Sequence, residues 1–237
     1  MRTFADMAIR PPIGEVSAQE RMAALAYRVG LSLVCLRFTS GTSSGEIESS
    51  ERIFRDAGLD VAVGIDISPK SRKQLLDLLK TLRNSFDIVA VKSPDTRTAA
   101  VAAHDSRVDL ISLELQKSFR TKQSILKTCE SYLELELSRI IRPPSQLSSE
   151  QLKTFCQEIE LAEKHRVNVV ISSGAASPLG LRAPRDLASL ATAFGLPKES
   201  SLDSVSKIPL NMVRRNRDRL SGGSVGYGVT LARSKER

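Results

Sequence analysis

Short apolar runs alternate with longer amphipathic stretches along most of this 237-residue chain. This alternation is typical of βαβ units that build a parallel sheet. Right-handed crossovers between such units leave a closed barrel and an open doubly wound sheet as alternatives, and a barrel is favoured. Seven runs rich in Val, Ile and Leu are predicted as strands: Thr3 to Ile9, Leu31 to Phe38, Leu59 to Ile67, Phe86 to Val91, Val108 to Leu113, Leu133 to Leu137 and Asn168 to Ser172.

The stretch after Pro69 has the spacing of a helix that packs on a sheet. Its leucines recur at i, i+3, i+4 and i+7, so they form one apolar stripe, while charged residues occupy the other side. These leucines are Leu75, Leu78, Leu79 and Leu82. Serines in favourable contexts for helix capping predict the starts of four helices. They are Ser17, Ser68, Ser93 and Ser148.

The last third of the chain is mostly helical in pattern, with helices predicted over Pro184 to Gly195, Glu199 to Val205 and Pro209 to Leu220. An eighth barrel strand is therefore either missing or supplied by Val225 to Leu231. We predict one α/β barrel domain over residues 1–220. Residues 221–237 are rich in glycine and end in cationic side chains, which predicts a flexible basic tail.

The charge balance points to a polyanionic partner. Lys and Arg total 35 against 27 Asp and Glu, which gives a net charge of +8. Such a surplus is expected of a protein that binds nucleic acid, although an unspecialised cationic surface gives the same number. Three widely spaced cysteines indicate neither a disulfide framework nor a zinc site. No apolar run approaches the roughly 20 residues that span a bilayer, so we expect a cytoplasmic protein with no membrane partner.

Metal chemistry has few candidate ligands. The chain has two histidines, His104 and His165, and neither has a second ligand at helical or strand spacing. A metal-dependent phosphoesterase with a barrel fold nevertheless stays as an alternative function, because barrel enzymes take catalytic carboxylates from strand ends. That alternative would use Asp6, Asp66, Glu114 and the loop at Ser172.

Phosphate binding is better supported, by the segment ISSGAASPLGLRAPRDL at residues 171–187. A strand there ends in two hydroxyls and a glycine, and two arginines follow beside a helix start. Loop amides and helix N-termini at the carboxyl ends of barrel strands favour anions. A tight turn with Arg185 paired to Asp186 is the alternative. The predicted phosphate ligands are Ser172, Ser173, Gly174, Arg182 and Arg185.

Two further segments concentrate positive charge, residues 116–128 and residues 207–220. Aromatic residues make up only 4% of the chain, so we expect binding to the backbone and shape of folded RNA rather than stacking on unpaired bases. The remaining predicted RNA contacts, from these segments and from strand ends, are Lys92, Arg97, Arg107, Lys117, Lys122, Arg214 and Arg215.

Two long motifs resemble one known family. VNVVISSGAASPLGLRAPRDLASLATAFGL, followed by IPLNMVRRNRDRL, is similar to the C-terminal part of the RNase P protein component 3 family. FDIVAVKSPDTRTAAVAAHDSRVDLISLE, which contains Arg107, Val108 and Asp109, resembles a strand-helix-strand segment of the same family. The resemblance covers most of residues 59–220.

This resemblance implies an irregular TIM-like barrel, related to the polymerase-and-histidinol-phosphatase type but without its metal site. It implies an archaeal ribonuclease P subunit in which the RNA carries the catalytic magnesium, so that this chain binds no cofactor. The implied partners are the RNase P RNA, protein component 2 and other RNase P proteins, with precursor tRNA met indirectly. The chain departs from related sequences at two places. Ala5-Asp6-Met7 stands where metal-binding relatives have H-x-H, and Ala176 stands where a basic residue is common.

Overall fold

Seven parallel strands lie side by side in chain order. The computed structural model describes residues 2–140, 149–221, 224–226 and 229–230. Every predicted strand is confirmed within a few residues. The strands are β1 (Ala5–Ile9), β2 (Leu33–Thr39), β3 (Asp60–Ile67), β4 (Ile88–Lys92), β5 (Leu110–Ser112), β6 (Tyr132–Glu136) and β7 (Val169–Ser172).

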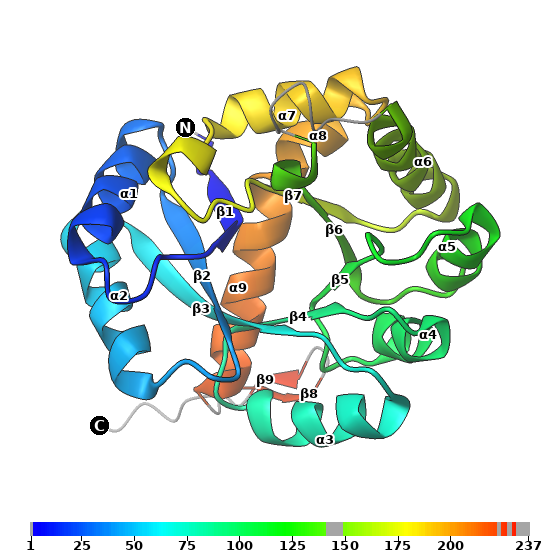
Figure 1. The fold of residues 1–237 in the computed structure, drawn as a ribbon, viewed down its shortest axis with the longest axis horizontal. Helices are drawn as coiled ribbons and strands as arrows, with labels where there is room; N and C mark the ends of the chain where they lie inside the picture. The colour runs from blue at the N-terminus through cyan, green and yellow to red at the C-terminus, as the bar shows by residue number, and fades with distance from the viewer. Residues whose placement is uncertain (1, 141–148, 222–223, 227–228, 231–237) are drawn as a thin grey trace.

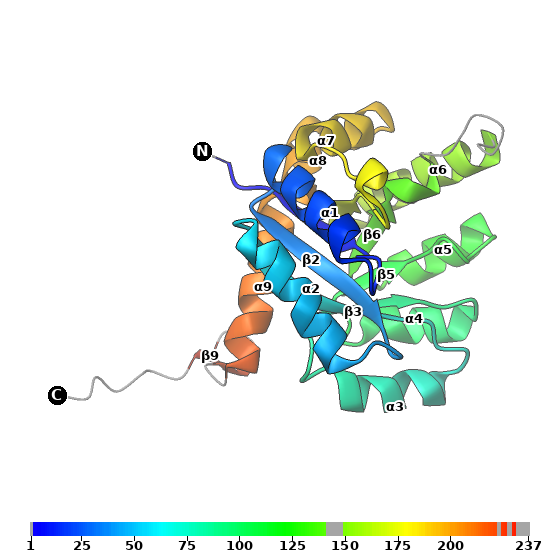
Figure 2. The same ribbon diagram turned by 60° about the vertical axis from the view of Figure 1, so that its left-hand side comes forward.

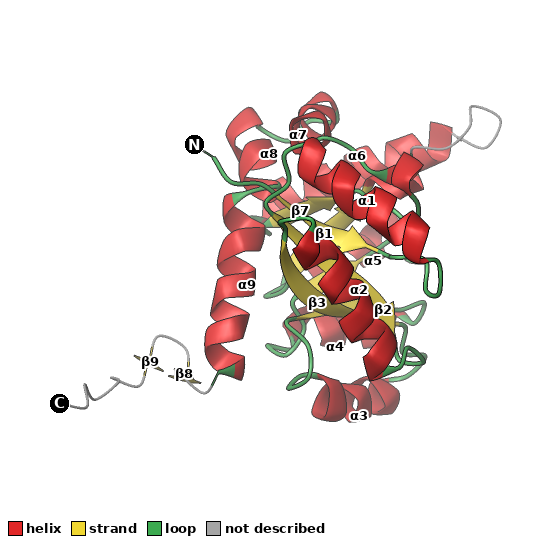
Figure 3. Ribbon diagram, turned by 90° about the vertical axis from the view of Figure 1, so that its left-hand side faces the viewer, coloured by secondary structure: helices red, strands yellow, loops and turns green. Residues whose placement is uncertain are grey.

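The sheet curls until its first and last strands meet. An isolated parallel bridge joins Ile9 to Ala175, and the Arg10 amide donates to the Ala175 carbonyl at 2.8 Å. The result is a nearly closed barrel in which helices surround the strands (Figure 1, Figure 3). The predicted TIM-like barrel is therefore confirmed, and the open doubly wound sheet is not what forms.

Most strands are followed by a helix that packs on the outside of the barrel. The leucine stripe of α3 behaves as predicted, since Leu75 and Leu79 are fully buried. The helices are α1 (Val16–Arg28), α2 (Ser44–Asp56), α3 (Arg72–Leu82), α4 (Thr96–His104), α5 (Phe119–Leu126), α6 (Ser149–His165), α7 (Pro184–Ala193), α8 (Lys198–Ser204) and α9 (Lys207–Leu220), with 3-10 turns η1 (Leu137–Arg139) and η3 (Pro178–Gly180).

Three of the predicted helix starts were wrong by one to three residues, and the fourth, at Ser148, lies outside the described residues. Helix α1 begins ahead of Ser17 and has no side-chain cap. Ser71 caps α3 and Asp95 caps α4, in place of the predicted Ser68 and Ser93. The physical reason is reach, because a capping oxygen accepts from the amide two or three residues on, and each serine-proline pair lies too far upstream.

The C-terminal residues that the structure describes do not supply an eighth barrel strand. Strands β8 (Ser224–Gly226) and β9 (Val229–Thr230) pair antiparallel with each other in a separate two-stranded sheet. The prediction of a barrel strand over Val225 to Leu231 was therefore wrong wherever the structure describes that stretch. Most of the predicted tail, residues 221–237, lies outside the described residues.

Helix α9 closes the barrel at the end where the strands begin (Figure 2). Met212 and Val213 pack against apolar residues inside the barrel. The Asn216 amide nitrogen donates to the Asp87 carbonyl and to Asp109 Oδ1, each at 2.8 Å. Arg217 donates to both carboxylate oxygens of Asp60 at 2.9 Å. These contacts join the last long helix to the first residues of three strands.

Residues alternate between the two faces of each strand. Outward residues pack under the helices in the larger hydrophobic core. Inward residues near the start of each strand are apolar and form the smaller core with α9. Those near the ends of β2 to β7 are charged or hydroxylated. The polar inward residues are Arg37, Asp66, Lys92, Ser112, Glu134, Glu136 and Ser172.

Candidate functional site at the carboxyl ends of the strands

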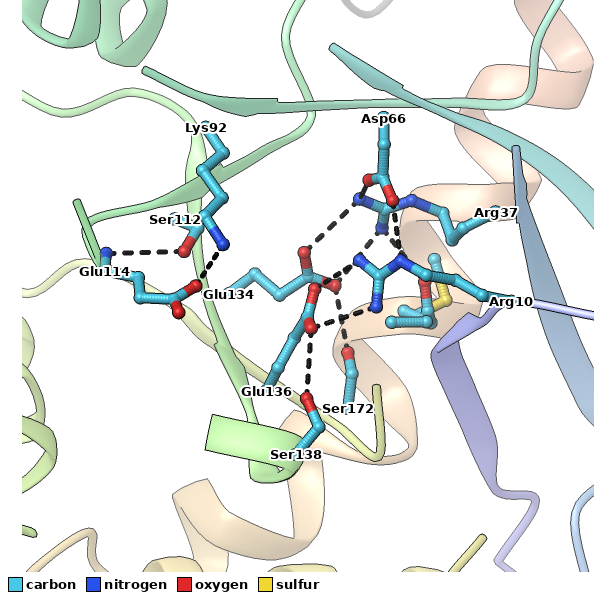
Figure 4. Close-up of polar contacts among 12 residues, drawn as sticks. Arg10, Arg37, Asp66, Lys92, Ser112, Glu114, Glu134, Glu136, Ser138 and Ser172 are labelled. Carbon is cyan, nitrogen blue, oxygen red and sulfur yellow. Dashed lines mark hydrogen bonds and ion pairs between the residues drawn. The ribbon is translucent and has the colours of Figure 1, made fainter. Parts of the chain in front are cut away.

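A polar cavity of about 380 Å³ lies at the carboxyl ends of the strands. Figure 4 shows its side chains converging from separate strands and the loops that follow them. Barrel proteins place binding and catalytic groups at this end. The charged residues that line it are Arg10, Arg37, Asp66, Lys92, Glu114, Glu134, Glu136 and Arg139.

Arg37 is the buried centre of this cluster. Its Nη1 donates to the Met7 carbonyl at 3.0 Å and to Glu134 Oε1 at 3.2 Å, and its Nη2 donates to Asp66. Gly64 on the neighbouring strand provides the space, since a Cβ there would lie 2.7 Å from Arg37 Cδ. Arg37 is therefore held rigidly between two carboxylates.

Arg10 completes the pairing from the end of β1. Its Nε donates to Asp66 Oδ2 at 2.9 Å. Its Nη1 and Nη2 donate to the two Glu136 oxygens at 3.0 and 2.6 Å. Two guanidinium groups thus pair with three carboxylates, in the geometry that makes arginine–carboxylate contacts strong.

The carboxylates of the cluster respond differently to burial. Burial opposes ionisation of Asp66 and Glu136, but Arg37 and Arg10 outweigh it for Asp66, and Arg10 does so for Glu136, so both pKa values are lowered. Burial dominates at Glu134 and raises its pKa to about 7, with Arg37 only partly offsetting it. Ser172 Oγ donates to Glu134 Oε1 at 3.0 Å. Glu134 therefore changes protonation near neutral pH.

We predict that Glu134 makes the protein less stable as the pH rises towards 7. The folded protein holds the Glu134 proton up to a pKa of about 7, whereas the ordinary pKa of a glutamate is 4.5. Between these pH values the folded state binds more protons than the unfolded state, so this contribution to the free energy of unfolding falls with pH. In Glu134→Gln, denaturant titrations from pH 5 to 8 should show a flatter decline. An unchanged pH profile would contradict the assignment.

The carboxylates proposed for a metal-dependent enzyme already have partners. Asp66 pairs with two arginines, and Glu114 pairs with Lys92. Asp6 Oδ1 accepts from the amides of Ala8 and Ser173, each at 3.1 Å. Within the described ranges, no three His, Cys, Asp or Glu side chains come together as a metal site. Neither histidine lines the cavity.

The loop after β7 does not present its hydroxyls to solvent. Ser172 and Ser173 are buried, and their side chains and amides bond to groups inside the protein. Gly174 has φ +66°, and a Cβ there would lie 2.8 Å from Glu136 Oε2. The prediction that these three residues hold a phosphate is corrected accordingly, because a phosphate would need them exposed.

The two arginines of this loop are directed elsewhere. Arg182 Nη1 donates to the carbonyls of Leu179 and Leu181 at 2.6 and 2.7 Å. Arg185 is exposed and lies over the Phe4 ring, 5.9 Å from its centroid. The structure therefore does not bring the five predicted phosphate ligands together.

The prediction that Lys122 contacts RNA is also wrong. It is buried, and its ammonium pairs with Glu158 on α6. Arg139 donates to the same carboxylate at 2.7 and 3.2 Å. Lys122 therefore belongs to an internal ion triad and is not free to meet RNA.

Three predicted RNA contacts do gather, beside the cavity at the ends of β4 and β5. Lys92 pairs with Glu114 across these strands. Thr96 Oγ1 donates to Gln116 Oε1 at 2.9 Å, and Arg97 and Lys117 follow those residues directly. Both are exposed, and neither side chain makes a hydrogen bond or ion pair to another described residue, although the charge of Arg97 helps to lower the pKa of Asp95. We refer to Lys92, Arg97 and Lys117 as the cationic rim.

The other predicted contacts lie at the opposite, amino end of the strands. Arg107 precedes β5 and donates to both Asp105 oxygens, at 2.9 and 2.7 Å. Arg214 and Arg215 are exposed on α9, which closes that end. The predicted RNA-binding residues are thus divided between the two ends of the barrel.

Five charged residues of the cavity were not predicted from the sequence: Arg10, Arg37, Glu134, Glu136 and Arg139. A signal for three of them is present. Charged residues are rarely buried, yet Arg37 interrupts an apolar strand and the two glutamates alternate with leucines in β6. Such charges on one face of a strand indicate a polar site inside the fold.

Comparison with known proteins now decides the family. The family model described as RNase P subunit p30 matches residues 3–221. The chain belongs to the RNase P subunit p30 family. Among the relatives of this p30 family chain is "Ribonuclease P protein component 3" of Methanosarcina barkeri, 25% identical over 93% of this chain and 91% of the relative. The protein of the same description from Methanococcoides burtonii is 25% identical over 91% and 89%.

Solved structures support the barrel fold of this p30 family chain. A chain in a "cryo-EM structure of archaeal Ribonuclease P with mature tRNA" superposes with a TM-score of 0.77, at 20% identity over 98% of this chain and 100% of that one. A putative prolidase from Bifidobacterium longum gives a TM-score of 0.54 at 10% identity, over 91% of this chain and 70% of that one. These likenesses concern the barrel alone. The predicted resemblance to the component 3 family is confirmed.

Proposed function

We propose that this chain binds the RNA subunit of ribonuclease P and supports it, without itself being catalytic, in the 5′ maturation of precursor tRNA. The observation that carries the proposal is membership of the RNase P subunit p30 family, with a match over residues 3–221. The chain is accordingly an RNase P protein subunit. Its net charge of +8 supports an RNA partner.

The cationic rim is the proposed RNA contact at the carboxyl end of the barrel. Arg97 and Lys117 have no internal ion pair to break among the described residues, so neutralising a phosphate would release counterions at little cost. Lys92 would exchange Glu114 for a phosphate. A rigid barrel holding these side chains fits recognition of a folded RNA by its backbone and shape.

The chemistry would belong to the RNA. Magnesium would sit on the RNA subunit, and this chain would bind no cofactor of its own. Protein component 2 and other RNase P proteins are the proposed protein partners, and precursor tRNA would be met through the assembly.

The proposed site of action is the cytoplasm. Cys35, Cys129 and Cys156 are free thiols, which fits a reducing compartment. In the part of the chain that the structure describes, no helix is both long enough and apolar enough to cross a bilayer.

Reconstitution tests the proposal. The chain is mixed with RNase P RNA and protein component 2, and precursor tRNA cleavage is measured at limiting magnesium. We expect the complete chain to lower the magnesium concentration needed for cleavage. The variant Arg97→Gln with Lys117→Gln should raise it again, and should reduce the slope of log affinity for RNA against log salt by up to about two.

Arg28→Gln is the matched control, because it removes one exposed cation at the end of α1. It should change neither measurement by more than a small amount. If the chain left cleavage unchanged and the isolated protein hydrolysed a phosphodiester with manganese, the phosphoesterase alternative would replace this proposal.

A further inference from the structure

Three arginines approach one carboxylate, that of Asp109, at the amino end of the barrel, which is the end opposite the cationic rim. Arg83 follows α3 and donates to Asp109 at 2.7 and 3.1 Å. Arg215 on α9 lies 3.6 Å from Asp109 Oδ1. Arg219, one helical turn further along α9, makes no hydrogen bond to that carboxylate. Guanidinium groups therefore outnumber carboxylates at this point.

Asp109 has no capacity left for Arg219. Besides Arg83, its carboxylate accepts from the Val89 amide at 2.9 Å and from Asn216 Nδ2 at 2.8 Å. The two other acids nearby are also engaged. Asp60 is held by Arg217 at 2.9 Å, and Asp87 accepts from the Val63 amide at 2.9 Å.

Arg219 is left with unused donors. Among the residues that the structure describes, its Nε and Nη2 are buried and have no hydrogen-bond partner, and the same is true of Arg83 Nε. A buried donor without a partner destabilises the folded state, and does so more strongly when the group is charged. Burial lowers the Arg219 pKa, and the neighbouring Arg83 lowers it further. A bound anion would accept hydrogen bonds from the unpartnered donors and would offset the positive charge of the two arginines.

We propose that Arg219, together with Arg83 and Arg215, forms a phosphate-binding site at the amino end of the barrel. Guanidinium groups match phosphate oxygens in geometry and charge. Arg215 is exposed and Arg219 is only partly buried as a whole residue, so a phosphate reaches them from the surface. An RNA phosphodiester is the favoured source, since Arg214 is exposed on the same helix. This choice of source rests on the proposed function.

The site gives the RNA a second contact, opposite the cationic rim. Inorganic phosphate shares the chemistry and serves as the simpler probe. Arg219→Gln removes the positive charge, and Arg219→Lys keeps the charge but lacks the planar guanidinium group with its several N–H donors. Arg55→Gln is the matched control, because Arg55 also lies in the last turn of a helix but is exposed and paired with Glu51 at 3.0 Å.

Two measurements on the full chain test the site. Inorganic phosphate should raise the Tm of the unmodified protein and of Arg55→Gln at constant ionic strength, and should not raise that of Arg219→Gln. In titrations with RNase P RNA, Arg219→Gln should reduce the slope of log affinity against log salt by about one. Arg219→Lys should keep most of the slope and lose part of the phosphate effect. Without phosphate, Arg219→Gln should be at least as stable as the unmodified protein.

The outcomes separate this site from the proposed function. In one outcome, phosphate raises the Tm only when Arg219 is present, while Arg219→Gln leaves the slope of log RNA affinity against log salt unchanged. This result would overturn RNA as the source of the phosphate. Loss of binding to protein component 2 with RNA binding intact would mean that the site meets a protein carboxylate, and this too would overturn it. Failure of the unmodified chain to bind RNA at all would refute the proposed function, whereas the phosphate arm would still report on the site.

Discussion

Arg37→Met is expected to lower the free energy of unfolding by about 3–5 kcal/mol, the range for removing one partner of a buried ion pair. Methionine is an unbranched side chain that fills much of the space of Arg37. Among the described residues, however, it leaves Glu134 with no cation at hydrogen-bond distance and Asp66 with Arg10 alone. Denaturant titration at pH 8 measures the loss. Because Glu134 can take up a proton at lower pH, the loss should be smaller at pH 5.

The control for this experiment is Arg55→Met. Arg55 makes an exposed pair with Glu51 one helical turn away. Exposed pairs of this kind contribute little to stability, so the denaturation midpoint should hardly move. A loss of similar size in both variants would show that Arg37 does not owe its importance to the buried carboxylates.

Glu158→Gln is expected to have a similarly large effect, again about 3–5 kcal/mol. Glu158 is fully buried and binds both Lys122 and Arg139. Its replacement by a neutral amide leaves two cations inside the protein with no carboxylate between them. Thermal and denaturant unfolding should both show the loss, and Glu160→Gln, exposed on the same helix, should show almost none.

A second substitution distinguishes charge from packing. Adding Lys122→Met to Glu158→Gln removes one of the two stranded cations and fills its volume with an apolar side chain. The double variant should recover part of the stability that Glu158→Gln loses. A double variant less stable than the single one would show that packing around Glu158 matters more than its charge.

The barrel could be predicted because the sequence pattern of each strand and helix lies within a few neighbouring residues. Each strand is a short apolar run, and each helix between strands has an apolar stripe such as Leu75 and Leu79. Helix starts were less predictable, because a cap depends on the backbone turn before the helix. Ser43 and Glu46 form a capping box inside a stretch that reads as a loop of small polar residues.

The cavity was not predictable from spacing along the chain. Arg37 is 29 residues from Asp66 and 97 from Glu134, and Arg10 is 126 from Glu136. Pairing over such separations is set by the order and register of the strands, which the sequence pattern leaves open. The phosphate site was predicted from hydroxyls and arginines that lie close together in the sequence. In the folded barrel, however, Ser172 and Ser173 are buried.

The position of α9 bears on how the protein is made. Asp60 begins one of the strands that it covers, and Asp87 and Asp109 directly precede two others; all three leave the ribosome long before Asn216 and Arg217. Domains commonly fold as units during synthesis. A nascent chain of this protein keeps the amino end of its barrel open to water until α9 has emerged, so the barrel cannot be completed while only its seven strands have been synthesised.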